Sequence, residues 1–166
     1  MALQSINVRI LDDRAKIPTR AHSTDAGLDI YALEDTEVTE GTLIPTGIAV
    51  SIPAGYEAQV RPRSGVTSRT DLRVQLGTVD SGYEGEIKVI GDCKSRLKLF
   101  RKVTRFFGLK DRIIEDSHQV YGGDKIAQLV ISPIETPKVN LVSEFESESE
   151  RGDKGFGSTD EKETIN

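Results

Sequence analysis

The sequence contains 166 residues, of which 36% are hydrophobic and 5% aromatic, and its formal net charge is −5. This length predicts one domain able to bury a core, while the acidic balance argues against direct nucleic-acid binding, which normally needs a basic domain. Cys93 is the one cysteine, so no intramolecular disulfide can form. The N-terminus has no long apolar run, which argues against secretion and a membrane span, and we expect a cytoplasmic protein.

Most of the chain shows the alternation that is typical of short strands. Ile6, Val8 and Ile10 alternate with polar residues, and a similar alternation leads up to Pro62. GIAVSIP, VQLGTV, EIKVI and KIAQLVISP are further β-rich runs bordered by turn residues. No helical period is evident before residue 95. The pattern predicts an all-β sandwich or barrel.

Residues 91–121 interrupt this pattern and form a predicted insert between two strands. In SRLKLFRKVTRFFG, apolar and basic residues each recur at helical spacing, with Ser95 as a plausible N-cap and Gly108 as the C′ residue. We therefore predict one short amphipathic helix with a basic face. A connection of this length is often functional, and the alternative is an insertion whose basic side is merely solvated.

The hydrophobic signal falls away after Leu141. Only three side chains among residues 143–166 are apolar, and such a segment buries too little surface to order itself. We therefore predict a core at residues 1–141 and a flexible C-terminal arm at residues 142–166 that becomes ordered when it binds something.

The stretch GTVDSGYEGEIKV, residues 77–89, has three glycines around two polar side chains. Its composition predicts a chain that turns back as a hairpin, with Asp80 and Tyr83 near the bend. Glycines let backbone groups approach a flat ligand closely, and an aromatic beside a carboxylate offers a stacking face next to a general base. The alternative is an ordinary turn with a tyrosine at the edge of the core.

Three further stretches carry side chains suited to phosphate or cation binding. STDAGLDIYA places Asp25 and Asp29 around a glycine, a turn composition that could hold a hydrated Mg²⁺. RPRSGVTSR puts Arg63 and Ser64 before a glycine, and so offers a cation and a hydroxyl to phosphate oxygens. GDKIAQLVI holds Gln128 inside an apolar strand, where a buried amide is either a structural bridge or a ligand contact.

Taken in order, DAGLDIYA, PRSG, GTVDSGYEGEI, GDKIAQLV and RGDKGFGST resemble the five motifs of the trimeric dUTP diphosphatases (dUTPases). The resemblance runs from about residue 21 to residue 159 and leaves only the insert unmatched. It implies a jelly-roll-like β protomer in a threefold homotrimer, with three active sites that are each assembled from three chains. It also implies Mg²⁺-dependent hydrolysis of dUTP to dUMP and pyrophosphate.

The resemblance assigns roles to the residues of the predicted hairpin. Asp80 matches the base that deprotonates the water attacking the α-phosphorus in line. Tyr83 matches the residue that packs under the deoxyribose, where a ribose 2′-hydroxyl would clash. Backbone groups of the hairpin, including Gly77 and Val79, match those that read uracil and leave no room for the methyl group of thymine.

The resemblance assigns the remaining roles to residues that face the phosphates and to the arm. Gln128 contacts the α-phosphate and the catalytic water, and Asp29 holds the water shell of a Mg²⁺ bound mainly by the triphosphate. The phosphate-binding stretch comprises Arg63, Ser64 and Gly65. The arm closes over the nucleotide through Arg151, Phe156, Gly157, Ser158 and Thr159, with Phe156 stacked on uracil. Asp160 follows, where the fifth motif normally ends in glycine.

Two alternatives belong to different classes of protein. The dCTP deaminases share the fold, but they place a catalytic glutamate where this sequence has Ile90. The second alternative is a mainly regulatory protein-binding module. The insert resembles the extra segment of staphylococcal phage dUTPases, which act in the cytoplasm of a bacterial host. That resemblance implies a second role, in which the protein binds and inactivates the repressor of a pathogenicity island. The basic face of the predicted helix would then offer charge complementary to the repressor.

Overall fold

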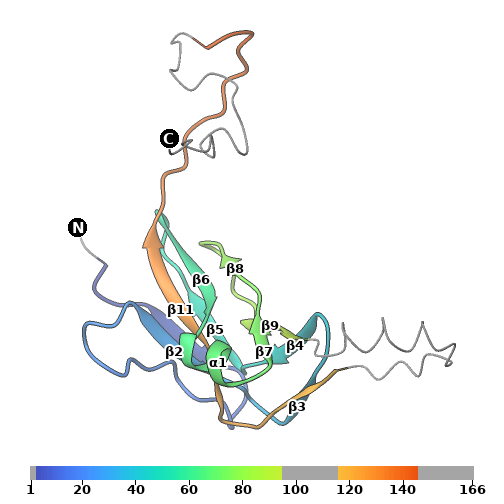
Figure 1. Ribbon diagram of the computed structural model, residues 1–166. Coiled ribbons are helices and arrows are strands. Elements are labelled where there is room, and N and C mark those ends of the chain that lie inside the picture. Colours follow the sequence, from blue (N-terminus) through green and yellow to red (C-terminus); the bar gives the residue numbers. More distant parts are fainter. Residues whose placement is uncertain (1–2, 95–115, 146–166) are drawn as a thin grey trace, which may run out of the picture. The chain divides into compact units, whose positions relative to one another are not determined.

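A computed structural model describes residues 3–94 and 116–145, and the chain divides into two units, residues 1–135 and 136–166. The described part of the first unit consists of strands and one short helix (Figure 1). Residues 136–145 of the second unit contain no helix or strand. The predicted helix after Ser95 and the predicted arm motif lie outside the described residues.

The elements follow one another with short connections. In chain order they are β1 (Asn7–Ile10), β2 (Gly27–Tyr31), β3 (Thr36–Val38), β4 (Thr42–Pro45), β5 (Ile48–Ser51), β6 (Tyr56–Pro62), α1 (Ser64–Arg69), β7 (Leu72–Val74), β8 (Gly77–Val79), β9 (Lys88–Cys93), β10 (His118–Val120) and β11 (Lys125–Pro133). The predicted strand KIAQLVISP is confirmed with its bounds as β11. No helix in the described part of the chain has the length and apolar content needed to cross a membrane.

The strands form antiparallel sheets. The largest has the order β2-β11-β6-β8, a second has the order β4-β9-β7, and β1-β5 and β10-β3 form two-stranded pairs. β11 is central to the largest sheet, where Gln128 lies opposite Asp29 of β2 and opposite Arg61 of β6. The registers of β11 thus bring together residues from three separate sequence motifs.

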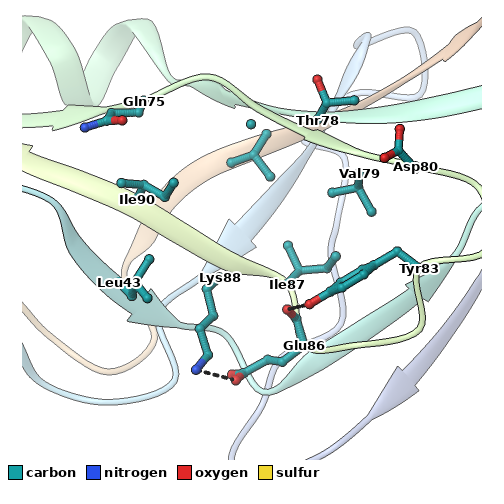
Figure 2. Close-up of a pocket in the computed structure, with 12 residues that line it drawn as sticks. Leu43, Gln75, Thr78, Val79, Asp80, Tyr83, Glu86, Ile87, Lys88 and Ile90 are labelled. Carbon is teal, nitrogen blue, oxygen red and sulfur yellow. Dashed lines mark hydrogen bonds and ion pairs between the residues drawn. The ribbon is translucent and has the colours of Figure 1, made fainter.

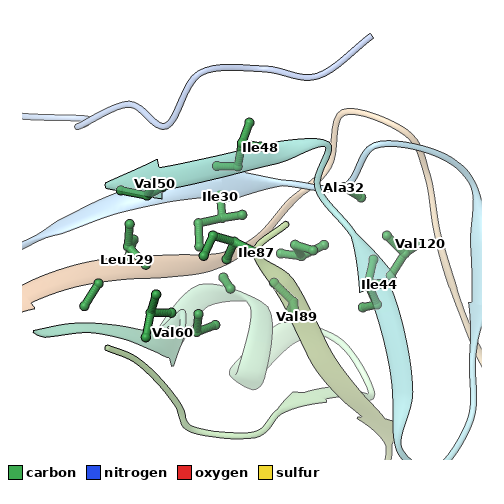
Figure 3. Packing of buried hydrophobic residues seen from close by; sticks show 14 of the residues in the cluster. Ile30, Ala32, Ile44, Ile48, Val50, Val60, Ile87, Val89, Val120 and Leu129 are labelled. Carbon is green, nitrogen blue, oxygen red and sulfur yellow. The ribbon is translucent and has the colours of Figure 1, made fainter. Parts of the chain in front are cut away.

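The core is built from aliphatic side chains on strands of different sheets. Ile30 of β2, Leu129 of β11 and Val89 of β9 are each fully buried, and Figure 3 shows them packed into one cluster with Ile87. Burying a side chain of this size stabilises the fold by about 1.5–3 kcal/mol before entropy is counted. The all-β prediction is confirmed.

Helix α1 is absent from the sequence-based prediction, which finds no helical period before residue 95. The helix has six residues and none of them is buried, so it carries no apolar stripe that a periodicity could reveal. Its turns are closed by the bonds from the Thr67 amide to the Arg63 carbonyl (2.9 Å) and from the Thr70 amide to the Val66 carbonyl (3.0 Å).

Candidate active site

The chain turns between β8 and β9 as predicted, but the prediction that these two strands pair as a hairpin is wrong. The Tyr83 amide donates to the Asp80 carbonyl (3.2 Å), and Gly82 has a φ of +88°, a left-handed conformation that glycine adopts without strain. However, β8 pairs with β6, whereas β9 pairs with β4 and β7. The two strands join different sheets because the segment before β9 bonds to the chain around Ile48 instead of to β8.

A cavity of about 510 Å³ opens where these strands diverge. One end is lined by Val79, Asp80 and Tyr83, and the other end by Leu43 and Ile90 (Figure 2). Gly77 also lines it, so the structure brings together four of the predicted site residues. The lining combines aliphatic side chains with polar ones, which include Gln75 and Lys88 besides Asp80, and a cavity of this kind suits an organic ligand with both apolar and polar groups.

Tyr83 lies at the same end of this cavity as Asp80 and is held at two points. Its hydroxyl donates to the Glu86 carbonyl (3.1 Å), as the dashed line in Figure 2 shows. Its ring covers Gly85 so closely that a Cβ at position 85 would overlap the ring and the hydroxyl. Because 48% of Tyr83 is still exposed, one face of the ring is available to a ligand.

Asp80 presents an exposed carboxylate at the rim of the cavity. Within residues 3–94 and 116–145, its side chain makes no hydrogen bond and no ion pair. A carboxylate without a protein partner can accept a proton from a water molecule, which is what a general base requires.

A second set of predicted residues is arranged around Asp29, which is 8% exposed. Arg63 Nε lies 2.8 Å from Asp29 Oδ1, and Lys125 Nζ lies 2.9 Å from Asp29 Oδ2. Arg63 also donates to the Lys125 carbonyl (3.2 Å). The hydrogen bond from Lys125 to Asp29, and then the attraction of the two charges, raise the pKa of Lys125. The strands β2 and β11 and the start of α1 thus assemble a cluster of two cations and one anion.

Further cationic charge lies beside this cluster. Lys16 Nζ and Lys125 Nζ lie 5.5 Å and 5.8 Å from the centre of the Tyr31 ring, within the range of a cation–π interaction. With Arg63, these lysines make three cations beside the Asp29 carboxylate. Guanidinium and ammonium groups so arranged are suited to phosphate oxygens.

Gln128 is half-buried, and its side-chain amide bridges β11 to the end of β6. Its Nε2 donates to the Pro62 carbonyl at the end of β6 (3.0 Å). On the other side, a Cβ at Gly27 would overlap the Gln128 side chain. Gln128 therefore fixes the chain that leads into Arg63. Ser64 and Gly65 follow, exposed, in the first turn of α1.

Asp29 and Asp80 lie at opposite edges of the largest sheet, Asp29 on β2 and Asp80 directly after β8. Among the described residues, no hydrogen bond or ion pair joins Asp80 or Tyr83 to the cluster of Asp29, Arg63 and Lys125. The predicted arm contacts, Arg151, Phe156, Gly157, Ser158 and Thr159, lie outside the described residues. A ligand that touches both sets would have to bridge surfaces that the protomer itself does not join.

The described residues do not fit a metal held directly by the protein. They contain no group of three or more His, Cys, Asp or Glu side chains that could hold a metal ion. Both oxygens of Asp29, the predicted partner of Mg²⁺, are already paired with cations. The described chain therefore offers phosphate-binding cations more readily than a cage of anionic ligands.

Sequence reasoning missed Lys125 and Glu86 as site residues. Lys125 stands in the quoted motif GDKIAQLV, but its partner Asp29 becomes visible only through the register of β2 against β11. Glu86 begins the run EIKVI, and a charged residue directly before the buried Ile87 is a signal that could have drawn attention to it.

Comparisons of the chain with a family model, with known sequences and with solved structures all find the same family. A family model described as dUTPase matches residues 13–97 and 115–160. The deoxyuridine 5′-triphosphate nucleotidohydrolase of Clostridium tetani is 39% identical over 164 residues, which cover 96% of this chain and 99% of that protein.

Two solved structures of phage enzymes are also similar to the chain. The dUTPase of Staphylococcus bacteriophage 80alpha with dUpNHpp superposes with a TM-score of 0.79 at 36% identity, covering 94% of this chain and 98% of that one; phage dUTPases are described there as controlling the transfer of virulence genes. A mutant dUTPase of phage phi11 of S. aureus, described with a structural Mg(II) ion, has a TM-score of 0.71 at 32% identity, covering 87% and 100% of the two chains.

Proposed function

Because this chain belongs to the dUTPase family and is a deoxyuridine 5′-triphosphate nucleotidohydrolase, we propose that Asp80 is the general base of its reaction. The observation that carries the proposal is the exposed Asp80 carboxylate, which has no partner among the described residues and stands beside Tyr83 at the rim of the cavity. The reaction converts dUTP and water to dUMP and pyrophosphate.

In the proposed reaction, Asp80 accepts a proton from a water molecule as the water oxygen forms a bond to the α-phosphorus. The bond between this phosphorus and the oxygen that bridges to the β-phosphorus breaks in line, and that oxygen leaves with pyrophosphate. An aspartate is a weak base, so its contribution comes from holding the water at the right place and angle. Gln128 is proposed to contact the same water and the α-phosphate.

The uracil and deoxyribose are proposed to bind between β8 and Tyr83. β8 is the edge strand of its sheet, so backbone N–H and C=O groups on its free side are available to a ligand. Uracil presents alternating acceptors and donors, which the backbone at Gly77 and Val79 can match. The exposed face of Tyr83 lies where a deoxyribose can stack, and a 2′-hydroxyl would meet the ring.

The triphosphate is proposed to bind the positive surface formed by Arg63 and Lys125, together with Ser64 and Gly65. Arg63 is held on one side by Asp29 and on the other by the Lys125 carbonyl, so its guanidinium is oriented before substrate arrives. Asp29 would reach a Mg²⁺ held mainly by the triphosphate through water, and such an ion would supply neutralisation of phosphate charge. The phi11 enzyme described with Mg(II) supports this assignment by similarity.

We further propose that the active site is completed by other copies of the chain in a threefold homotrimer. The separation of the Asp80 turn from the Asp29 cluster supports this, because one substrate has to touch both. Residues of the arm, Arg151, Phe156, Gly157, Ser158 and Thr159, are proposed to close over the bound nucleotide. Removing residues 150–166 should leave the trimer intact and greatly impair hydrolysis; loss of the trimer would contradict this role.

The experiment that tests the general base is pyrophosphate release from dUTP, dTTP, UTP and dCTP by the wild type and by Asp80→Asn. We expect hydrolysis of dUTP alone and its loss in the variant, whereas full activity of Asp80→Asn would contradict the mechanism. The same assay tests the deaminase alternative, because uracil nucleotides formed from dCTP would support it. The apolar Ile90, which lines the cavity in place of the glutamate of deaminases, argues against that outcome.

A second function, binding and inactivating a pathogenicity-island repressor in the bacterial cytoplasm, is also proposed. It is supported by the phage enzyme described as controlling the transfer of virulence genes. The gap in the family match, residues 98–114, falls within the predicted insert at residues 91–121. Deleting residues 94–116 and measuring both hydrolysis and repressor binding separates the two roles. Unchanged repressor binding would mean that the insert is not the contact.

A further inference from the structure

We propose that Glu86 is a positioning residue for Tyr83 and that it thereby sets the selectivity of the site for deoxyribose over ribose. This inference rests on the proposed role of Tyr83 against the sugar. Glu86 is not expected to touch the substrate. It acts by fixing the short segment between the Asp80 turn and β9, on which the Tyr83 side chain rests.

The Glu86 carboxylate ties this segment to the turn between β4 and β5. Its Oε1 accepts hydrogen bonds from the amides of Thr46 (3.2 Å) and Gly47 (2.9 Å). Gly47 has a φ of +68°, which lets both amides point at one oxygen. The Glu86 side chain is 24% exposed, so these are partly buried, charge-assisted bonds, which are stronger than bonds between neutral groups.

Two further bonds hold the next residue of the same segment. The Thr46 hydroxyl donates to the Ile87 carbonyl, and the Ile87 amide donates to the Ile48 carbonyl (2.8 Å). Thr46 and Ile87 are both buried. The position of residues 86 and 87 is therefore set by the β4–β5 turn and not by β8, which explains why the expected hairpin does not form.

The consequence for Tyr83 follows from its few contacts. Its hydroxyl donates to the Glu86 carbonyl, and its ring lies on Gly85. Because about half of the residue is exposed, packing alone does not fix the ring. A shift of the segment at residues 85–87 therefore moves the ring, and a displacement of about 1 Å near a reacting ligand is enough to change a rate up to 10²-fold.

A contact from β1 holds residues 84–88 less firmly than the bonds of the Glu86 carboxylate do. Arg9 Nη2 donates to the Glu84 carbonyl (3.0 Å), and this bond is exposed. Lys88 Nζ lies 3.5 Å from the other oxygen of Glu86, with 47% of the Lys88 side chain exposed, and exposed pairs of this kind contribute little. Among the described contacts that hold residues 84–88, the bonds of the Glu86 carboxylate to the Thr46 and Gly47 amides are the partly buried, charge-assisted ones.

The test is the ratio of kcat/KM for dUTP to kcat/KM for UTP in three variants. Glu86→Ala removes the acceptor from two amides, and we expect the ratio to fall about tenfold. Glu86→Gln keeps an oxygen at the same place and should restore a ratio close to that of the wild type. Glu34→Ala is the matched control, because it removes a glutamate whose pair with Arg14 is exposed, and its ratio should not change.

A folded Glu86→Ala variant with the wild-type ratio would overturn the proposal. If that variant does not fold, Thr46→Val removes the hydroxyl bond to Ile87 while keeping the side-chain volume and the backbone amide, and the ratio should again fall. An unchanged ratio in Thr46→Val would then count against the proposal.

A double-mutant cycle with Tyr83→Phe separates positioning from a general structural role. If Glu86 acts through the Tyr83 hydroxyl, Glu86→Ala should change the ratio much less in the Tyr83→Phe background than in the wild type. Equal effects in both backgrounds would contradict the inference. Failure of the proposed function is distinct, because it would show as a wild type that does not discriminate dUTP from UTP at all.

Discussion

Asp29 and Asp80 are both carboxylates of the site, but their surroundings are opposite. Asp29 is nearly buried, and each of its oxygens lies within 3 Å of a cationic nitrogen. Asp80 is exposed, and its side chain has no hydrogen bond or ion pair among the residues that the structure describes. Both oxygens of the Asp29 carboxylate are paired with protein cations, whereas the Asp80 carboxylate can accept hydrogen bonds from water or a ligand.

This difference is consistent with the two roles proposed for the carboxylates. A phosphate-binding surface works best when its cations are oriented before the ligand arrives, and Asp29 supplies that order to Arg63 and Lys125. A general base needs a free lone pair, so hydrogen bonds to its own protein would reduce its use. The comparison predicts that substitutions at Asp29 affect stability and binding, whereas substitutions at Asp80 affect the rate of the chemical step.

The largest expected effect is on catalysis in Asp80→Asn. The amide has the size of the carboxylate but cannot take a proton from water, so kcat for dUTP should fall by about 10²- to 10⁴-fold. The midpoint of urea unfolding should not change, because the described structure shows no contact of the side chain to lose. Asp13→Asn, which removes another exposed carboxylate, is the control and should retain wild-type kcat. A large loss of stability in Asp80→Asn would contradict the comparison.

Local patterns in the sequence predict the strands well, because each strand carries its own signal. The run KIAQLVISP becomes β11 with its bounds, since all residues from Ile126 to Ile131 except Gln128 are apolar and the run lies between a turn and a proline. The turn at Asp80 is equally visible from its glycines. Helix α1 is not visible, because none of its residues is buried.

Pairing between distant segments is what the sequence does not reveal. The stretch at residues 77–89 suggests a hairpin. In the structure, however, the segment before β9 bonds to the β4–β5 turn and not to β8. This depends on contacts of Glu86 with Thr46 and Gly47. In the same way, the pairing of Asp29 with Lys125 depends on strand register. Hydrophobic periodicity contains neither piece of information.

Asp29→Asn is expected to have the next largest effect. It leaves Arg63 and Lys125 close together without the anion between them, so the free energy of unfolding should fall by about 1–3 kcal/mol, less than for a fully buried pair because both cations are partly exposed. The measurement is urea unfolding, with KM for dUTP expected to rise. Glu34→Gln is the control, because both side chains of its pair with Arg14 are exposed and the pair should contribute nothing measurable. An equal loss of unfolding free energy in the two variants would mean that the Asp29 cluster stabilises the fold no more than a surface ion pair does.

Gly85→Ala tests the other region with a smaller expected effect. The added methyl group would overlap the Tyr83 ring, which is exposed enough to move away. Because Gly85 does not have a positive φ, the backbone tolerates alanine, and stability should change by less than about 0.5 kcal/mol. Selectivity for dUTP over UTP should fall about tenfold, within the range for misplacement of a positioning side chain. Gly65→Ala is a useful comparison, because its added methyl group meets open space. Since Gly65 belongs to the proposed phosphate-binding stretch, this variant should leave the ratio of dUTP to UTP hydrolysis unchanged. Gly41→Ala is unsuitable, because the φ of Gly41 is positive.

The smallest expected effect is an alkaline change in stability that depends on Lys125. The bond to Asp29 raises the pKa of Lys125 above its ordinary value, so the ion pair contributes its full stabilisation below the unfolded-state pKa of about 10.4. That contribution is lost as the pH rises through the folded-state pKa. The difference in unfolding free energy between the wild type and Lys125→Met should therefore be constant from pH 7 to about pH 10 and then shrink. Lys138→Met, at an exposed lysine, should show no such change. A difference that stays constant up to about pH 11 would mean that the folded structure does not stabilise the charged form of Lys125, and would contradict the raised pKa.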